Sequence, residues 1–307
     1  MRIAFFGTPE FAVPSLRALL EEGFDVGVVV TQPDRPQGRS RSRLIGSPVK
    51  AVALEEDIPV LQPERPAGEF ADQLAAVGAD VGVVVAYGHI LPPAILAIPR
   101  LGMVNVHASV LPRWRGAAPI QWAILSGDET SGVTVMQMEA GMDTGPILHT
   151  IETEIPADET AGELSLRLAE LGAAALIESL TLLASDALTP HPQDDALATL
   201  APKINRQTTR IDWSRDAAGL ARRVRAFDPE PGAWAVLDGE EIKLFGGRAA
   251  SGAGGVPGTV ISAGESLVIA ADVGALEVSE VQPAGRRRMS AAEWSRGHPD
   301  VVGARFT

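Results

Sequence analysis

The chain has 307 residues, of which 46% are hydrophobic and 21% charged, a composition typical of a folded protein long enough for two domains. It contains no cysteine, which excludes disulfide bonds, thiolate catalysis and cysteine metal ligands. The formal net charge of −13 argues against nonspecific nucleic-acid binding over the whole surface.

The N-terminal half is predicted to be an α/β domain. Residues 3–6 and 26–31 are short apolar runs typical of buried strands, and the apolar residues between them recur at helical spacing up to Gly23. Strand, helix and strand at this spacing imply a parallel sheet with a right-handed crossover. Further strands are predicted at residues 80–86, 103–107, 132–138 and 147–154, and helices at residues 47–56, 70–77, 117–125 and 160–185.

Two segments between these elements are predicted to be loops. Residues 32–46 are polar, rich in Arg, Ser and Gly, and without periodicity. Residues 87–93 follow a strand at its carboxyl end, where open α/β sheets bind ligands. The first turn holds only Gly7, so the sequence supports neither a dinucleotide site nor a P-loop.

The pattern changes after about residue 205. A helix is predicted from Asp212 to about Ala226, and short strands broken by Gly and Pro are predicted at residues 234–237, 241–245, 258–261, 266–270 and 275–281. We therefore expect an α/β protein with a Rossmann-like domain and mostly parallel sheet in residues 1–188. A linker at residues 189–207 and a small OB-like β-barrel domain at residues 208–307 complete the predicted organisation.

Basic residues cluster in three places, at residues 34–50, 203–225 and 286–288. Any one cluster is typical of a solvated face, but three of them in an acidic protein favour a polyanionic partner. The apolar run at the N-terminus is too short for a signal peptide, and no run of 18 apolar residues occurs. We therefore expect a cytoplasmic protein that does not associate with membranes.

Three polar residues form the candidate site. Asn105 and His107 lie two apart at the end of an apolar run, so in a strand both side chains share one face. Asp143 lies in a turn between Gly141 and Gly145. An Asn amide can stabilise the oxyanion of a tetrahedral intermediate, and a His can carry a proton from an attacking to a leaving amine. Asp143, if it reaches His107, favours the imidazolium. Together they suit acyl transfer between two nitrogens.

Other interpretations remain open at this point. Ser109 lies close to His107, but the G-x-S-x-G motif of Ser–His–Asp hydrolases is absent. A mononuclear metal site is disfavoured because no H-x-x-x-H spacing occurs, and we expect no metal. The remaining alternative is that the three residues are structural polar groups.

Longer motifs carry a resemblance to a known family. They are F-F-G-T-P-E-F-A at 5–12, T-Q-P-D-R-P at 31–36, S-P-V-K at 47–50, V-V-A-Y-G-x-I-L-P at 84–92, N-V-H-A-S-V-L-P-R-W-R-G-A-A-P-I-Q at 105–121, M-Q-M-E-A-G-M-D-T-G at 136–145, R-I-D-W at 210–213 and V-Q-P-A-G at 281–285. On these motifs the chain resembles the methionyl-tRNA formyltransferase family of folate-dependent formyltransferases over nearly its whole length.

The resemblance implies that 10-formyltetrahydrofolate donates the formyl group and that the α-amino group of methionyl-initiator tRNA accepts it, for initiation of translation. It implies that residues 1–188 are the catalytic domain and residues 208–307 a tRNA-binding domain. We expect a monomer without an obligate protein partner. Asn105, His107 and Asp143 match the family's catalytic residues. The folate-binding positions it implies are Tyr87, Gly88, Ile90, Leu91, Pro92, Ser109, Val110, Leu111 and Pro112. The tRNA-binding positions it implies are Arg39, Arg41, Arg43, Lys203, Arg206 and Arg210.

Two departures from the family pattern are visible. Position 110 is Val where the family usually has Leu, and the loop at residues 38–46 is richer in Arg and Ser than usual. Two alternative functions also remain: a folate-dependent formyltransferase acting on a small amine such as a ribonucleotide or amino sugar, and a catalytically inactive RNA-binding module.

Overall fold

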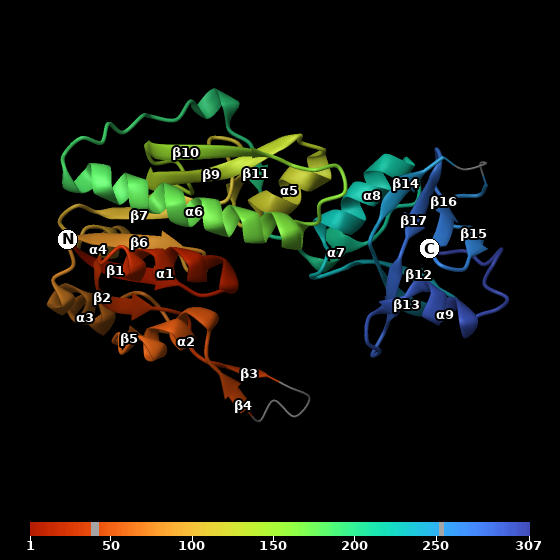
Figure 1. Ribbon diagram of the computed structural model, residues 1–307, viewed down its shortest axis with the longest axis horizontal. Helices are drawn as coiled ribbons and strands as arrows, with labels where there is room; N and C mark the ends of the chain where they lie inside the picture. Colours follow the sequence, from red (N-terminus) through yellow and green to blue (C-terminus); the bar gives the residue numbers. More distant parts are fainter. Residues whose placement is uncertain (38–42, 252–254) are drawn as a thin grey trace. The chain divides into compact units, whose positions relative to one another are not determined.

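The computed structural model describes residues 1–37, 43–251 and 255–307 (Figure 1). The chain divides into two compact units. Unit 1 comprises Met1–Gly116, Ser131–Thr153 and Ser165–Leu200, and unit 2 comprises Ala117–Thr130, Glu154–Leu164 and Ala201–Thr307. Two short segments that precede Ala201 along the chain therefore belong to the second unit.

Unit 1 is built on a seven-stranded sheet with the strand order β10-β9-β7-β6-β1-β2-β5. The strands are β1 (Arg2–Gly7), β2 (Asp25–Val30), β5 (Val60–Leu61), β6 (Val81–Val85), β7 (Met103–His107), β9 (Thr130–Gln137) and β10 (Ile147–Glu154). β1 pairs in parallel with β2 and β6, β2 with β5, and β6 with β7, whereas β7 and β9 are antiparallel. The predicted Rossmann-like, mostly parallel sheet is confirmed.

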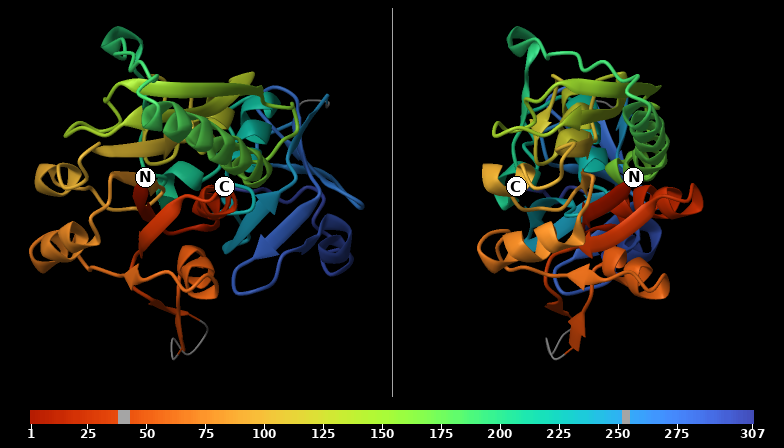
Figure 2. Two further views of the ribbon diagram at one scale, coloured as in Figure 1. Left: turned by 60° about the vertical axis from the view of Figure 1, so that its left-hand side comes forward. Right: turned by 90° about the vertical axis from the view of Figure 1, so that its left-hand side faces the viewer.

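Helices cover both faces of this sheet (Figure 2). They are α1 (Val13–Glu21), α2 (Pro48–Glu55), α3 (Glu69–Val77), α4 (Pro93–Leu96) and α6 (Ala161–Ala184), with 3-10 turns η1 (Glu10–Ala12) and η2 (Asp195–Leu197). α2 begins where the sequence predicts, because the Ser47 hydroxyl accepts the Lys50 N–H and Pro48 occupies the first turn. None of the helices in the described ranges is long and apolar enough to cross a membrane.

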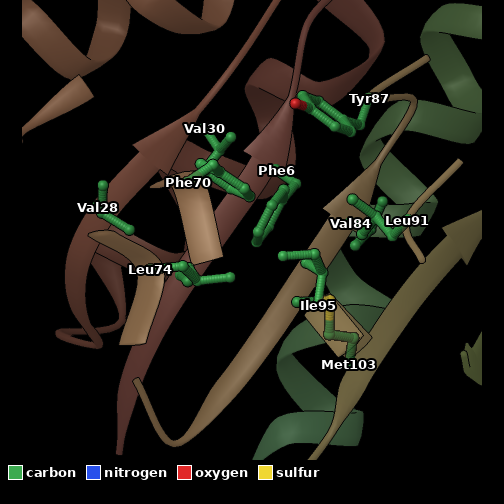
Figure 3. Packing of buried hydrophobic residues seen from close by; sticks show 11 residues of the cluster. Phe6, Val28, Val30, Phe70, Leu74, Val84, Tyr87, Leu91, Ile95 and Met103 are labelled. Atoms are coloured by element: carbon green, nitrogen blue, oxygen red, sulfur yellow. The ribbon is translucent and has the colours of Figure 1, made fainter. Parts of the chain in front are cut away.

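An aromatic cluster holds the sheet to α3 and α4 (Figure 3). Phe6 of β1 makes edge contacts with Phe70 of α3 and with Tyr87, at ring-centroid distances of 6.3 and 5.5 Å. Met103 of β7 belongs to the same cluster. Because alternate strand residues share a face, Asn105 and His107 continue the face on which Met103 lies. The core thus fixes the strand that carries the candidate site.

The segment predicted to be a plain loop at residues 32–46 contains a hairpin. β3 (Arg35–Gln37) and β4 (Arg43–Ile45) pair antiparallel. The prediction of a loop without strands was wrong because this hairpin buries no apolar face: Leu44 is 64% exposed, so no alternation marks it. Arg39 and Arg41 lie outside the described residues.

Unit 2 consists mainly of antiparallel strands in two four-stranded sheets, β12-β13-β18-β19 and β14-β17-β16-β15. The strands are β12 (Ala233–Leu237), β13 (Glu240–Phe245), β14 (Arg248–Ala250), β15 (Val260–Ala263), β16 (Leu267–Ala270), β17 (Ala275–Val278), β18 (Glu280–Pro283) and β19 (Met289–Ser290). The helices are α5 (Pro119–Ser126), α7 (Arg206–Thr209), α8 (Ala217–Ala226) and α9 (Ala291–Arg296), and β8 (Arg115–Gly116) and β11 (Leu200–Ala201) are two-residue strands elsewhere in the chain.

Two predicted boundaries in this unit were wrong. The helix predicted from Asp212 begins at Ala217, because Asp216 caps the Gly219 N–H at 2.8 Å while Asp212 bonds Ser214 in a separate turn. The strand predicted at residues 275–281 is split between β17 and β18, which belong to different sheets. An uninterrupted apolar run does not reveal where a chain passes from one sheet to the next.

Candidate active site

β7 brings Asn105 and His107 to the carboxyl end of the parallel strands. Asn105 pairs with Val84 of β6, and His107 pairs with Thr134 of β9. After β1 the chain forms β2 and β5 on one side of it and then crosses to β6 and β7 on the other side, so the strand order reverses between β1 and β6. A ligand site is expected outside the carboxyl ends at such a point.

The imidazole of His107 is held by a hydrogen bond from one of its two ring nitrogens. Its Nε2 lies 2.9 Å from the backbone oxygen of Trp114, and a carbonyl only accepts, so Nε2 carries a proton. The other nitrogen, Nδ1, lies 3.8 Å from Oδ2 of Asp143. The imidazole is 6% exposed. Nδ1 is therefore the position available for proton exchange, and once protonated it faces a carboxylate.

Asp143 is fixed in the tight turn that leads from β9 to β10. Its φ of 55° lies in the left-handed region, which Asp tolerates better than most residues. Its Oδ2 accepts the N–H of Gly116 at 2.8 Å. Gly145 closes the turn, since a Cβ there would lie 1.8 Å from the Gln137 carbonyl oxygen. The turn predicted between two glycines is present, and its geometry brings Asp143 to His107.

The Asn105 amide stands apart from this network. It has no hydrogen-bond partner among the residues that the structure describes, and the side chain is only partly buried. Its two N–H donors and its carbonyl oxygen are therefore available to a ligand. The structure thus brings the three sequence-predicted residues to one end of the sheet, with one donor free.

The Ser109 to Pro112 segment follows β7 directly and is locked in place. The Thr134 hydroxyl donates to the Ser109 carbonyl at 2.7 Å and accepts the Leu111 N–H at 3.1 Å. The Ser109 hydroxyl donates to the Arg113 carbonyl at 2.6 Å. Ser109 and Leu111 are buried, whereas Val110 and Pro112 are partly exposed. The segment is a rigid wall beside His107, and its one hydroxyl is occupied.

The loop from Tyr87 to Pro92 lies across the carboxyl end of β6. The Tyr87 carbonyl accepts the Thr8 hydroxyl at 3.0 Å and the Gln32 amide at 3.1 Å, which ties the loops after β1, β2 and β6 together. Tyr87 and Leu91 are buried core residues that anchor the loop, and burial raises the pKa of Tyr87 to about 12. Ile90 is 93% exposed. Of the five predicted positions in this loop, Gly88 and Ile90 are exposed and Pro92 is partly exposed.

Two basic residues of the 203–210 segment lie over one tryptophan in unit 2, Trp234. The Arg206 guanidinium lies 4.4 Å from the centre of the Trp234 ring, and that of Arg210 lies 5.5 Å from it. Arg206 also pairs with Glu241, whereas Lys203 and Arg210 form no ion pair with any described residue. Lys203 and Arg210 are exposed, so both charges face solvent. Arg43 belongs to β4.

Part of the predicted basic clusters is structural. Arg288 bonds both carboxylate oxygens of the buried Asp228, at 2.7 and 3.3 Å, and also pairs with Glu280. Lys50 lies 2.7 Å from Asp34, and its hydrogen bond is the main reason why the pKa of that carboxyl lies below its usual value. These bases are engaged within the protein and add little to a polyanion-binding surface.

Sequence reasoning missed the residues that support the site. Gln193 bonds two carbonyls of the Asp143 turn, and Thr199 bonds the N–H of Trp114. Gln193 lies 50 residues from Asp143, and Thr199 lies 85 residues from Trp114. No local spacing connects such partners, so only the tertiary structure reveals them.

Comparisons with known proteins identify the family of the chain. The formyl transferase family matches residues 1–180, and the C-terminal domain of formyl transferases matches residues 203–299. The chain is 50% identical to a methionyl-tRNA formyltransferase of Pseudomonas putida (95% of this chain, 94% of that protein). It is 49% identical to that of Methylococcus capsulatus (97% of each).

Solved structures share the fold at lower identity. HypX from Aquifex aeolicus in complex with tetrahydrofolic acid superimposes with a TM-score of 0.69 and 20% identity over 98% of this chain, which spans about half (48%) of HypX. The sugar 3N-formyl transferase WlaRD superimposes with a TM-score of 0.68 and 19% identity over 94% of this chain and 99% of its own. With two family matches and relatives named methionyl-tRNA formyltransferase at about 50% identity along nearly the whole length, the chain belongs to the formyl transferase family.

Proposed function

We propose that the protein transfers the formyl group of 10-formyltetrahydrofolate to the α-amino group of methionyl-initiator tRNA, for initiation of translation. The observation that carries this proposal is the grouping of a free Asn105 amide, the Nδ1 atom of His107 and the Asp143 carboxylate at one end of the sheet. Relatives of about 50% identity along both domains support the choice of substrates.

The residues present fit a folate. The unbonded Asn105 amide offers donors for a carbonyl oxygen. Ile90 is 93% exposed on a loop at the carboxyl end of β6, and such an apolar side chain suits the face of a planar ring. We assign Tyr87 to Pro92 and Ser109 to Pro112 to the folate site, with Tyr87, Ser109 and Leu111 acting as its buried supports.

The three catalytic residues divide the reaction between them. Bound 10-formyltetrahydrofolate supplies the formyl group. The Asn105 N–H donates to the formyl oxygen as negative charge develops there. Nδ1 of His107 takes the proton of the attacking amine as the new C–N bond forms, and returns it to the donor nitrogen as the old C–N bond breaks. Asp143 faces the imidazolium during the interval.

This division requires no enzyme nucleophile. The one hydroxyl close to His107 in sequence, that of Ser109, is buried and bonded to the Arg113 carbonyl. In a Ser–His–Asp hydrolase that hydroxyl must instead be hydrogen-bonded to the imidazole. The observed bond therefore favours direct transfer between two amines over an acyl-enzyme mechanism.

The acceptor is assigned to the basic residues that follow the first domain. We propose that Lys203, Arg206 and Arg210, with residues 208–307 and with Arg39, Arg41 and Arg43, contact tRNA. A phosphoribosylglycinamide formyltransferase of Bacillus halodurans covers only 61% of this chain. A ribonucleotide acceptor therefore leaves the C-terminal sheets without a role. Against an amino-sugar acceptor, whose enzyme WlaRD covers 94% of this chain, the choice of tRNA is supported by the basic segment and the relatives of about 50% identity.

The test compares three acceptors with 10-formyltetrahydrofolate as donor: methionyl-initiator tRNA, glycinamide ribonucleotide and a nucleotide-linked amino sugar. Formylation of the tRNA alone is expected, and preference for a small amine would overturn the proposal. Asn105→Ala should lower kcat on the order of 10²- to 10³-fold, and His107→Ala on the order of 10²- to 10⁴-fold. tRNA binding without formyl transfer by the wild type would instead support an inactive RNA-binding module.

The cellular setting follows from the same function. We propose a cytoplasmic monomer, since both substrates belong to cytoplasmic translation. Sedimentation of the purified protein at the mass of one chain, 32.2 kDa, tests the oligomeric state.

A further inference from the structure

The segment that follows α6 carries a glutamine, Gln193, whose side-chain hydrogen bonds form a junction beside the active site. The Gln193 amide nitrogen donates to the carbonyls of Asp143 and Gly145, at 2.9 and 2.7 Å. Its carbonyl oxygen accepts Nε and Nη2 of Arg115, at 3.0 and 2.8 Å. All donors and both acceptor positions of one side chain are therefore satisfied, which fixes its orientation.

Arg115 is the second member of this junction. Its side chain is 6% exposed, and the same Nη2 also donates to Asp195 at 2.8 Å. The next residue, Gly116, donates its N–H to the Asp143 carboxylate at 2.8 Å. Asp143 is thus held twice from one loop: its side chain directly by Gly116, and its backbone through Gln193 and Arg115.

The same segment also bonds the loop whose Trp114 carbonyl holds His107. The Thr199 hydroxyl accepts the N–H of Trp114 at 2.9 Å, and the Thr199 N–H donates to the Pro112 carbonyl at 3.3 Å. Trp114, whose own carbonyl bonds Nε2 of His107, has a φ of 62°. A bulky residue adopts that left-handed backbone only where its neighbours hold it.

We propose that residues 193–199, here called the return segment, are a working part of the active site, in which Gln193 is a positioning residue for Asp143 and Thr199 for His107. This inference rests on the proposed formyl transfer. A purely structural role would be expected to bury apolar surface, yet in this segment Asp195 is 83% exposed and Leu197 65% exposed. What the segment does contribute are hydrogen bonds directed at the two loops that orient the catalytic residues.

The first test substitutes the junction and separates kcat from KM. Gln193→Ala should lower kcat on the order of 10- to 100-fold, with the KM of both substrates within about twofold of wild type, because it misplaces a group without removing a binding contact. Gln193→Glu keeps an acceptor for Arg115 but turns a carboxylate oxygen toward two carbonyls, so it should lower kcat at least as much as Gln193→Ala does. The matched control is Gln73→Ala, an exposed position on α3, with unchanged kinetics expected. A near-normal kcat in Gln193→Glu would overturn the inference.

A double-mutant cycle tests whether Gln193 acts through Asp143. In an Asp143→Asn background, Gln193→Ala should cost less than about threefold further, since the group that it positions is already disabled. A full multiplicative loss would mean that Gln193 acts elsewhere, and would overturn the assignment. If Gln193→Ala does not fold, the isosteric Thr199→Val carries the test, with a fall in kcat on the order of 10-fold at unchanged KM expected.

A spectroscopic measurement separates failure of this inference from failure of the proposed function. The chain has 5 histidines, so the imidazole resonances of His107 can be assigned with a His107→Gln variant. Thr199→Val should shift or broaden those resonances, and Gln73→Ala should not. If the wild type fails to formylate methionyl-tRNA, the proposed function falls while this readout still decides on the return segment. Unchanged His107 resonances in Thr199→Val would contradict the inference.

Discussion

Replacing Asp143 with Asn isolates the charge that faces His107. The Asn side chain has the same shape and keeps an oxygen to accept the Gly116 N–H, so the turn should retain its geometry. At 3.8 Å, a carboxylate and an imidazolium attract by about 4 kcal/mol at an effective dielectric constant of about 20. The carboxylate is 19% exposed, which reduces this to roughly 2–4 kcal/mol.

The attraction exists only while Nδ1 holds the proton, so its loss should appear in the transition state and not in the bound substrates. We expect Asp143→Asn to lower kcat roughly 30- to 1,000-fold, with the KM of tRNA and folate little changed. The assay is the initial rate of methionyl-tRNA formylation at saturating substrates, with the exposed Asp72→Asn on α3 as matched control. A kcat within about threefold of wild type would refute the electrostatic role, and a raised folate KM would place Asp143 in binding instead.

Three further predictions address stability and tRNA binding. Tyr87 is the one tyrosine of the chain and has a pKa of about 12, above that of the unfolded chain. Its contribution to stability is therefore complete below about pH 10 and is lost as the pH rises toward 12. Urea unfolding from pH 9 to 11 should show this loss in the wild type and not in Tyr87→Phe, and an identical pH dependence of the two proteins would contradict it. Arg288→Met should lower the free energy of unfolding by about 2–4 kcal/mol because it leaves the buried Asp228 without its cation, whereas the exposed Arg287→Met should cost under about 1 kcal/mol; equal losses in denaturant unfolding would refute the distinction. The affinity for tRNA should fall steeply with salt, and Lys203→Ala should reduce the slope of log affinity against log salt by about 1 without changing the folate KM; a flat salt response would exclude phosphate contacts by this segment.

The sequence predicted those elements whose local signals agree with their tertiary setting. The start of α2 combines Ser47 as cap with Pro48 in the first turn, and the structure has both features. β7 was predicted from its apolar run, and its alternation placed Asn105 and His107 on one face. Residues of this kind can be located because the hydrogen bonds and periodicity that define them lie within a few positions of each other.

The failures have the opposite character. The β3–β4 hairpin buries no apolar face, so its pairing leaves no pattern in the sequence. The break between β17 and β18 depends on which sheet each strand joins. Gln193 lies in the segment that the sequence predicted only as a linker, and its partners are about 50 to 80 residues away along the chain. Composition describes such a segment correctly as irregular and exposed, but says nothing of what its polar side chains contact.

The loop of residues 113–116 sets the geometry of the candidate site. The Trp114 carbonyl holds His107, the Gly116 N–H holds Asp143, and these two groups flank the single residue Arg115. A shift of the loop therefore moves both partners together and tends to preserve the 3.8 Å separation of Nδ1 and Oδ2. Asn105 also belongs to β7 but lacks this tether, because its amide bonds no described residue. Motion of the loop should consequently disturb the distance between His107 and Asp143 less than it disturbs the alignment of His107 with the Asn105 donor. Substitutions that loosen the loop should therefore affect stabilisation of the formyl oxygen first.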